Sequence, residues 1–249
     1  MPKDRRGREL ALALLASTAL GLFFWHGLVL WPVKLLVVLM HESGHAAATL
    51  LVGGRVESIR LSPGEGGLTT SLYAQTLLRQ IVVSSAGYVG STVSGCVLLW
   101  AAARATSGRL PLALLAGWTA LVAILWVRDP FTLAFAFAAT FLLGLCARLG
   151  PSLLRRLVLA FLASFSVLYA LFDIEDDLLH FQSRGLGQSD ADALAYVTHV
   201  PALAWGLGWG ALSLVLVALT LTGIFAGGAQ RRGRIRSATN SESEPSRAK

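Results

Sequence analysis

Two histidines and a glutamate in the segment HESGH at residues 41–45 carry the clearest chemical signal in this chain. Residues four apart on a helix lie on one face, so the imidazoles of His41 and His45 can bind one tetrahedral metal ion. Glu42 lies beside them and can act as a general base toward a water molecule. Zinc suits these ligands and would lower the pKa of that water to about 7. The segment therefore predicts a zinc site with hydrolytic chemistry.

This HExxH segment is rare by chance. With five His and seven Glu among 249 residues, random placement gives only about 0.003 matches to the motif. The segment also lies in an apolar run, where ionisable groups are costly to insert into a membrane and are expected to be paired and functional. The alternative is a polar cluster that bridges helices without a metal.

A hydrolytic zinc site needs a third protein ligand and one open position. The acidic candidates come later in the chain and are Asp173, Asp176, Asp177 and Asp190. Asp173 directly follows an apolar run, so it is expected to reach deepest into the membrane. Asp177, one helical turn further on, is its main rival. Asp190 is interpreted as a helix start with Ser189 as N-cap, and the alternative for the other candidates is an acidic helix end facing water.

Two segments could bind a substrate peptide. Residues 55–72 contain strand-forming residues around a Gly-rich turn, which predicts a β-hairpin. The hairpin could bind an unwound peptide by β-addition, or it could be a simple connection. Small residues also recur every four positions from residue 87 to residue 95, which gives a face for close helix packing. That face could serve packing alone, or it could lie against the zinc helix and help hold substrate. The candidate substrate-binding residues are Gly67, Thr69 and Gly87.

Membrane helices are the elements expected to hold these residues. Hydrophobic residues make up 55% of the chain and charged residues 14%, whereas a soluble domain has roughly 25% charged residues. The apolar runs, of about 17 to 27 residues, are long enough to cross a hydrocarbon core of about 30 Å. We therefore expect an all-α polytopic membrane protein with about six to seven transmembrane helices and a small β-hairpin after the HExxH helix. The expected helices are 9–30, 33–52, 77–103, 110–127, 131–148, 154–173 and 201–227.

Basic residues are concentrated at the two ends of the chain. Ten of the 21 Lys and Arg residues lie in 1–8 and 228–249, where they are typical of anchors on the cytoplasmic side of a membrane. Nucleic-acid binding is not expected, because no basic segment is interleaved with aromatic residues. Two cytoplasmic ends require an even number of crossings, but the apolar runs number seven. Either one of the runs 110–127 and 131–148 is not a full crossing, or one end of the chain breaks the rule.

The chain divides into a basic head at 1–8, a membrane-embedded domain at 9–227 and a disordered basic tail at 228–249. Within the domain, residues 174–199 are expected to form an acidic loop. Trp205 and Trp209 are interpreted as part of an interfacial aromatic belt. The sequence predicts a multi-pass protein of the cell membrane whose partners are the lipid bilayer and a membrane protein substrate, and it leaves the oligomeric state open.

Taken in order, these segments resemble the site-2-protease-type metallopeptidases of peptidase family M50, and within it the M50B-like branch. The resemblance covers about residues 33–210. It rests on HESGHA at 41–46, the Gly-rich hairpin with GLTT at 67–70, SSAGYVGS at 84–91, FDIEDDL at 172–178, SDADALA at 189–195 and WGLGWG at 205–210.

The resemblance implies an intramembrane zinc protease with His41 and His45 as ligands and Glu42 as catalytic base. The family takes its third ligand from an Asp in a later helix, which is matched here to Asp173. That Asp usually stands in Asn-Pro-Asp-Gly or Leu-Asp-Gly, whereas this chain has Phe-Asp-Ile. The Pro and Asn that the family carries in the helix matched to 84–91 are absent, and no PDZ-like insertion is visible.

Two functions from different classes follow. The first is an intramembrane zinc metalloprotease that hydrolyses peptide bonds in or near transmembrane segments of membrane protein substrates, with Zn²⁺ as cofactor. The second is a proteolytically silent membrane scaffold or partner-binding protein of the same fold. The intact HExxH favours the first, because a silent relative does not need Glu42. A metal transporter would need a chain of polar residues through several helices, and the sequence offers one cluster.

Overall fold

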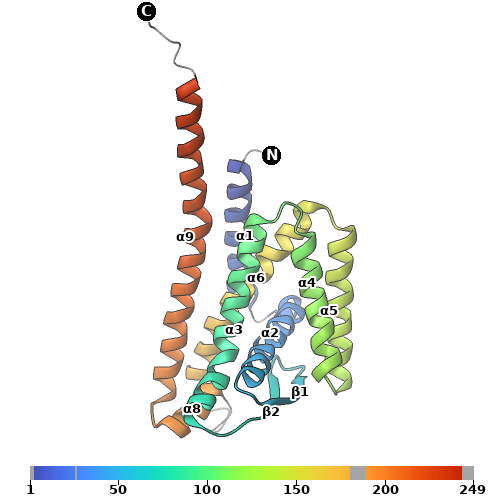
Figure 1. The fold of residues 1–249 in the computed structure, drawn as a ribbon. Coiled ribbons are helices and arrows are strands. Elements are labelled where there is room, and N and C mark those ends of the chain that lie inside the picture. The colour runs from blue at the N-terminus through green and yellow to red at the C-terminus, as the bar shows by residue number, and fades with distance from the viewer. Residues whose placement is uncertain (1–2, 26, 180–188, 243–249) are drawn as a thin grey trace, which may run out of the picture.

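The computed structural model describes the backbone of residues 3–25, 27–179 and 189–242, and the side chains of 8–25, 27–169, 172 and 189–225. Helices dominate, and one antiparallel hairpin follows the helix that carries the HExxH segment (Figure 1). The expected fold class is therefore confirmed. In chain order the elements are α1 (Lys3–Phe24), the 3₁₀ helix η1 (Leu28–Leu30), α2 (Trp31–Leu51), β1 (Arg55–Leu61), β2 (Gly67–Leu72), α3 (Leu77–Arg104), α4 (Arg109–Trp126), α5 (Pro130–Leu149), α6 (Ser152–Leu179), α8 (Asp190–Thr198) and α9 (Ala202–Glu242).

Five helices within the described residues are long and apolar enough to span a membrane: α3, α4, α5, residues 152–169 of α6, and residues 202–225 of α9. Their outward faces carry large apolar side chains, such as Ile124, Phe141 and Leu219, which are exposed. A contiguous surface of this kind is stable against lipid and not against water. The chain is therefore an integral membrane protein.

Helix α2 is different, because it does not cross the bundle. It begins near mid-height and ends at the hairpin, whereas α1 comes down from the end where the N-terminus lies (Figure 1). Pro32 lies in the first turn of α2, where its missing N–H costs no helical hydrogen bond. The side chains of Leu35, Val37 and Leu39 are completely buried. The apolar character of α2 thus reflects burial inside the protein and not contact with lipid.

This placement corrects the expected membrane topology. The apolar segments 9–30 and 33–52 follow one another in the same direction, so together they cross the molecule once, from one end to the other (Figure 1). The two runs that were suspected of being short, 110–127 and 131–148, form the full-length helices α4 and α5. Both ends of the chain consequently lie at the same end of the molecule, as the basic residues predict.

The hairpin predicted at residues 55–72 is confirmed. Its strands pair antiparallel, from Arg55 opposite Leu72 to Leu61 opposite Gly67, with a β-bulge in β1. Strand β1 packs against the α4–α5 connection, where Ile59 forms a parallel bridge with Val127, and against the start of α5, where the Leu61 N–H donates to Thr132 Oγ1 over 2.8 Å. Among the described strands β2 pairs only with β1, so its outer edge is unpaired.

Two segment boundaries expected from the sequence differ from the helix boundaries in the structure. Helix α6 continues to Leu179 and α8 begins at Asp190, so both ends of the expected acidic loop 174–199 are helical and its residues 180–188 lie outside the described part. Helix α9 continues to Glu242, past residue 228, where the disordered tail was expected.

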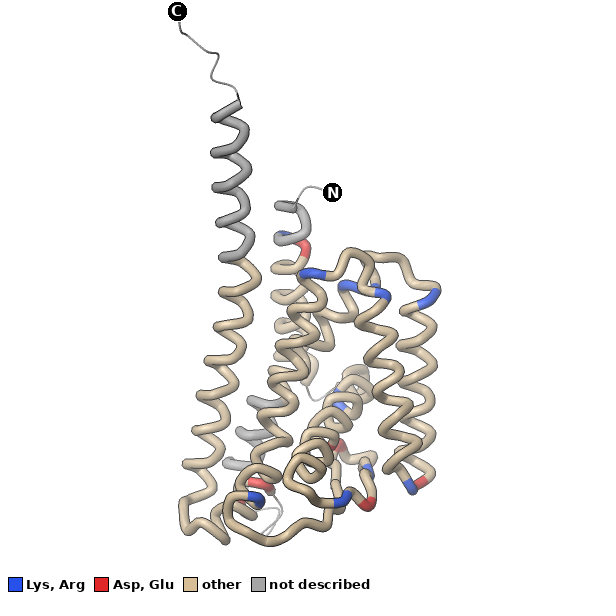
Figure 2. The backbone as a smooth tube through the Cα atoms, viewed as in Figure 1, with Lys and Arg blue, Asp and Glu red and all other residues tan. Residues whose placement is uncertain are grey.

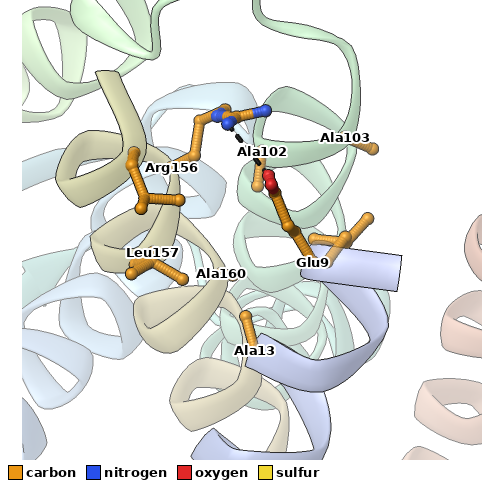
Figure 3. Close-up of a pocket in the computed structure, with 9 residues that line it drawn as sticks. Glu9, Ala13, Ala102, Ala103, Arg156, Leu157 and Ala160 are labelled. Carbon is orange, nitrogen blue, oxygen red and sulfur yellow. Dashed lines mark hydrogen bonds and ion pairs between the residues drawn. The ribbon is translucent and has the colours of Figure 1, made fainter. Parts of the chain in front are cut away.

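At the end of the bundle that carries both termini, Glu9 of α1 pairs with Arg156 of α6 over 3.2 Å (Figure 3). The hollow between them is lined by Ala102, Leu157 and other small or apolar residues, and has a volume of about 20 Å³. That is room for roughly one water molecule. The pair therefore serves to hold α1 against α6 and does not form a ligand site.

Helices α2 and α3 approach so closely that their contact requires glycine. A Cβ atom on Gly44 would lie 2.2 Å from the carbonyl oxygen of Ala86, which is a backbone atom and cannot rotate away. Gly117 of α4 provides the contrast, because a Cβ atom there would meet nothing within 4 Å.

We therefore expect Gly44→Ala to destabilise the protein by about 1–3 kcal/mol through overpacking. Gly117→Ala, the matched control, should be neutral or stabilising by about 0.5–1 kcal/mol, because alanine favours a helix more than glycine does. The measurement is the thermal unfolding midpoint of each purified variant in detergent. Equal midpoints for the two variants would contradict the close contact between α2 and α3.

Candidate metal centre

The two histidines of the HExxH segment converge, as their spacing predicts. His41 and His45 lie one turn apart on α2, both are buried, and their Nε2 atoms are 3.0 Å from one another. The Nδ1–H of His45 donates to the carbonyl oxygen of Val83 over 2.8 Å. That hydrogen bond fixes the tautomer of His45, so that its Nε2 lone pair is available to a metal ion.

The carboxylate that completes the group comes from Asp190. Its Oδ2 atom lies 3.3 Å from His41 Nε2 and 3.1 Å from His45 Nε2. Ligand atoms at 2.0–2.1 Å from a tetrahedral zinc lie about 3.3 Å from one another, which matches these separations. Within the described part of the chain, His41, His45 and Asp190 are the His, Cys, Asp or Glu residues grouped closely enough to hold a metal ion.

Gly87 of α3 leaves the space that a metal ion would need. A Cβ atom at residue 87 would lie 2.2 Å from His41 Nε2 and 2.5 Å from His45 Nε2. These distances are close to the length of a zinc–nitrogen bond, so any larger residue would fill the place beside the two nitrogens. The donor set and the open space therefore fit a metal ion.

Asp190 also begins helix α8, as the sequence predicts. The Ser189 hydroxyl accepts a hydrogen bond from the Asp192 N–H over 3.1 Å, which confirms Ser189 as N-cap. The helix start and a ligand role are thus compatible, although the sequence presented them as alternatives. Burial alone would raise the pKa of the Asp190 carboxyl, but the imidazoles of His45 and His41 hold that pKa below its usual range.

The side chains favoured by the sequence as third ligand, Asp173 and its rival Asp177, lie outside the described residues. Their backbone belongs to α6. The structure therefore leaves both predictions untested and brings forward Asp190, which the sequence ranked lower. The available signal was SDADALA at 189–195, whose first Asp follows an N-cap and can point back toward the bundle.

Glu42 is held by the hairpin. Thr69 Oγ1 donates to Glu42 Oε2 over 2.6 Å, and the same hydroxyl lies 3.0 Å from the Glu42 carbonyl oxygen. A Cβ atom on Gly67 would lie 2.3 Å from Glu42 Oε1, so glycine is required for β2 to lie this close. Two of the three candidate substrate-binding residues thus contact the glutamate, and the third, Gly87, lies beside the imidazoles. Their role in substrate binding stays a prediction.

These groups line one cavity of about 650 Å³. The lining includes the imidazoles, Glu42 and Asp190 together with the edge of β2 and the hairpin turn. Tyr73, Gln75 and Ser71 add further polar groups to the lining. A cavity of this size and polarity can hold both water and a short peptide segment.

The hairpin turn is held by a partly buried ion pair that was not predicted. Lys34 of α2 lies 2.8 Å from Glu65 Oε2, its side chain is only 4% exposed, and its ammonium group lies over the Trp25 ring. Glu65 takes a positive φ of 68°, which a residue with a side chain rarely adopts. A lysine inside an apolar helix was the available signal, since such a residue needs a partner.

An aromatic stack joins α9 to the metal ligands. The Tyr88 ring stacks on Trp209 with centroids 4.8 Å apart and meets the His41 ring edge-to-face at 4.9 Å. Trp209 is 5% exposed and donates from Nε1 to Ser85 Oγ. Its interpretation as an interfacial aromatic residue is therefore wrong, because its ring packs inside the protein.

Comparison with known proteins gives one match. The family model described as Peptidase M50B-like matches residues 13–220, which include every residue of the candidate metal centre. No curated protein and no solved structure matches the chain.

If the three ligands bind one metal ion, each should be required for it. We expect His41→Ala, His45→Ala and Asp190→Asn each to lose most of the bound metal, because two protein ligands hold zinc poorly. Elemental analysis of the purified variants measures metal per chain. Asp192→Asn is the matched control, since it changes an aspartate in the same helical turn outside the group, and it should keep the wild-type metal content.

Asp173→Asn belongs in the same series. If that variant loses the metal while Asp190→Asn keeps it, Asp190 is not the ligand and the preference derived from the sequence is correct.

Proposed function

From the premise that the chain belongs to the Peptidase M50B-like family, we propose that it is an intramembrane zinc endopeptidase, which hydrolyses peptide bonds in or near transmembrane segments of membrane proteins. The observation that carries this proposal is the convergence of His41, His45 and Asp190 beside Glu42 in one polar cavity. Its partners would be the substrate and the lipid bilayer, and its location the cell membrane.

Zinc held by the two imidazoles and the Asp190 carboxylate would act as a Lewis acid on the scissile carbonyl and lower the pKa of the attacking water. Glu42 would take the proton from that water and deliver it to the leaving amine. The cavity supplies polar surface for water inside an otherwise apolar bundle. This supports hydrolysis at a site enclosed by membrane helices.

The hairpin would orient the base. With the Thr69 hydroxyl bound to Oε2, and with Gly67 leaving room for the carboxylate beside β2, the carboxylate of Glu42 is held in one orientation. A base held in this way loses little entropy when the water arrives.

The unpaired edge of β2 supports a way of holding the substrate. Proteolysis needs an extended peptide, because a helix hides its scissile bonds. An extended segment could add to β2 as a further strand, using backbone hydrogen bonds. Since β2 residues 67–69 and 71 line the cavity, a peptide bound there would pass close to Glu42 and the metal ligands. The silent-scaffold alternative gains no support, because it gives no reason for a possible metal-binding group and a glutamate to share one polar cavity.

The first test replaces the base. Glu42→Gln should reduce cleavage of a reporter transmembrane substrate in liposomes by about 10²–10⁴-fold, because an amide cannot accept the proton. Bound zinc should stay unchanged, because all three ligands remain. Glu57→Gln is the matched control, since Glu57 lies on the exposed side of β1 and pairs with Arg55. Full activity of Glu42→Gln would overturn the proposal.

The second test concerns Thr69. Thr69→Val keeps the shape of the side chain and removes the hydroxyl, and we expect a loss of about 10–100-fold in kcat with little change in KM. Thr69→Ser should restore most of the activity, and Thr70→Val, on the exposed neighbour, should have no effect. A rise in KM at unchanged kcat would instead assign Thr69 to substrate binding.

A further inference from the structure

Along the backbone, the positions of Lys, Arg, Asp and Glu lie mainly toward two opposite ends of the bundle, in two bands (Figure 2). Between the bands the helices are free of charge: residues 80–103 of α3, 110–126 of α4, 131–147 of α5 and 157–169 of α6 contain no Lys, Arg, Asp or Glu. The uncharged stretch of α4, residues 110–126, would be about 26 Å long at 1.5 Å per residue, which is close to the thickness of a hydrocarbon core of about 30 Å.

The band at the end with both termini is strongly basic. Six arginines and one glutamate have described side chains there, a net charge of +5. Most of them flank the short α3–α4 and α5–α6 connections, and the basic residues of 3–8 and 231–236 lie at the same end on the backbones of α1 and α9 (Figure 1). The described members are Arg8, Glu9, Arg104, Arg109, Arg148, Arg155 and Arg156.

The band at the end with the hairpin and the metal centre has no excess of basic over acidic residues. Five basic and six acidic residues have described side chains at that end or on α2, which leads down to it, a net charge of −1. Two of the basic residues are paired within the band, Lys34 with Glu65 and Arg55 with Glu57. The described members are Lys34, Arg55, Arg60, Arg79, Arg128, Glu42, Glu57, Glu65, Asp129, Asp190 and Asp192.

Lysine and arginine in short connections set the orientation of a membrane protein, with the richer side in the cytoplasm, where they also meet anionic headgroups. We propose that the arginine-rich end faces the cytoplasm and that the metal centre opens at the extracytoplasmic side of the membrane. Resting on the proposed function, this assigns the substrate class: membrane proteins whose scissile segment lies near the extracytoplasmic boundary.

Cysteine labelling tests this orientation without using activity. In a background with Cys96→Ala and Cys146→Ala, Thr106→Cys marks the α3–α4 connection and Tyr196→Cys marks the hairpin end, where Tyr196 is 84% exposed. A membrane-impermeant maleimide is applied to intact and permeabilised cells. We expect Tyr196→Cys to react in intact cells and Thr106→Cys only after permeabilisation. The reverse pattern, or labelling of neither site in intact cells, would overturn the proposal.

Substitutions that remove charge test whether the arginines determine this orientation. Arg104→Gln, Arg109→Gln and Arg148→Gln combined should move a measurable fraction of molecules to the reverse orientation in the same labelling assay. Arg55→Gln with Arg60→Gln, the control at the other end, should leave the orientation unchanged. An unchanged labelling pattern in the triple variant would show that these arginines do not set the orientation. Because labelling needs no catalysis, an inactive protein with the expected pattern separates failure of the proposed function from failure of this inference.

Discussion

The close passage of α3 across α2 is the constraint on which the rest of the site depends. Gly44 lets the two backbones touch at Ala86, and Gly87 then passes beside both imidazole nitrogens. A side chain at residue 44 would separate the helices, and one at residue 87 would occupy the place of a metal ion. The same contact brings Val83 to His45, where its carbonyl fixes the imidazole tautomer. Helix packing and ligand geometry are thus a single structural feature.

Charge neutralisation is the second requirement, because ionisable groups inside a membrane protein are stable only when paired. The imidazoles face Asp190, the Glu42 carboxylate accepts from Thr69, and Lys34 is paired with Glu65. The last pair lies on the hairpin turn, so the interaction that satisfies a buried lysine also sets how closely β2 approaches the glutamate. The hairpin is therefore part of the site, although it lies in sequence outside the HExxH helix.

Local patterns predicted much of this arrangement. The spacing of His41 and His45 predicts that their imidazoles meet, and the Gly-rich turn predicts a hairpin. Both features depend on residues close together in the sequence, and both are present in the structure. The unpredicted features depend on long-range contacts. Asp190 is 145 residues beyond His45, and no periodicity tells which of several acidic residues meets the histidines. Likewise, an apolar run predicts that its side chains avoid water, but not whether they contact lipid or protein. For this reason α2 was expected to cross the membrane.

The central claim is that two imidazoles and one carboxylate bind a single metal ion next to Glu42. X-ray absorption at the zinc edge of the purified protein tests it most directly, because the spectrum identifies the ligand atoms themselves. We expect four light-atom ligands at about 2.0–2.1 Å with the outer-shell pattern of two imidazoles, and loss of most of this zinc signal in Asp190→Asn. A sulfur ligand at about 2.3 Å, or a spectrum that Asp190→Asn leaves unchanged, would contradict the account.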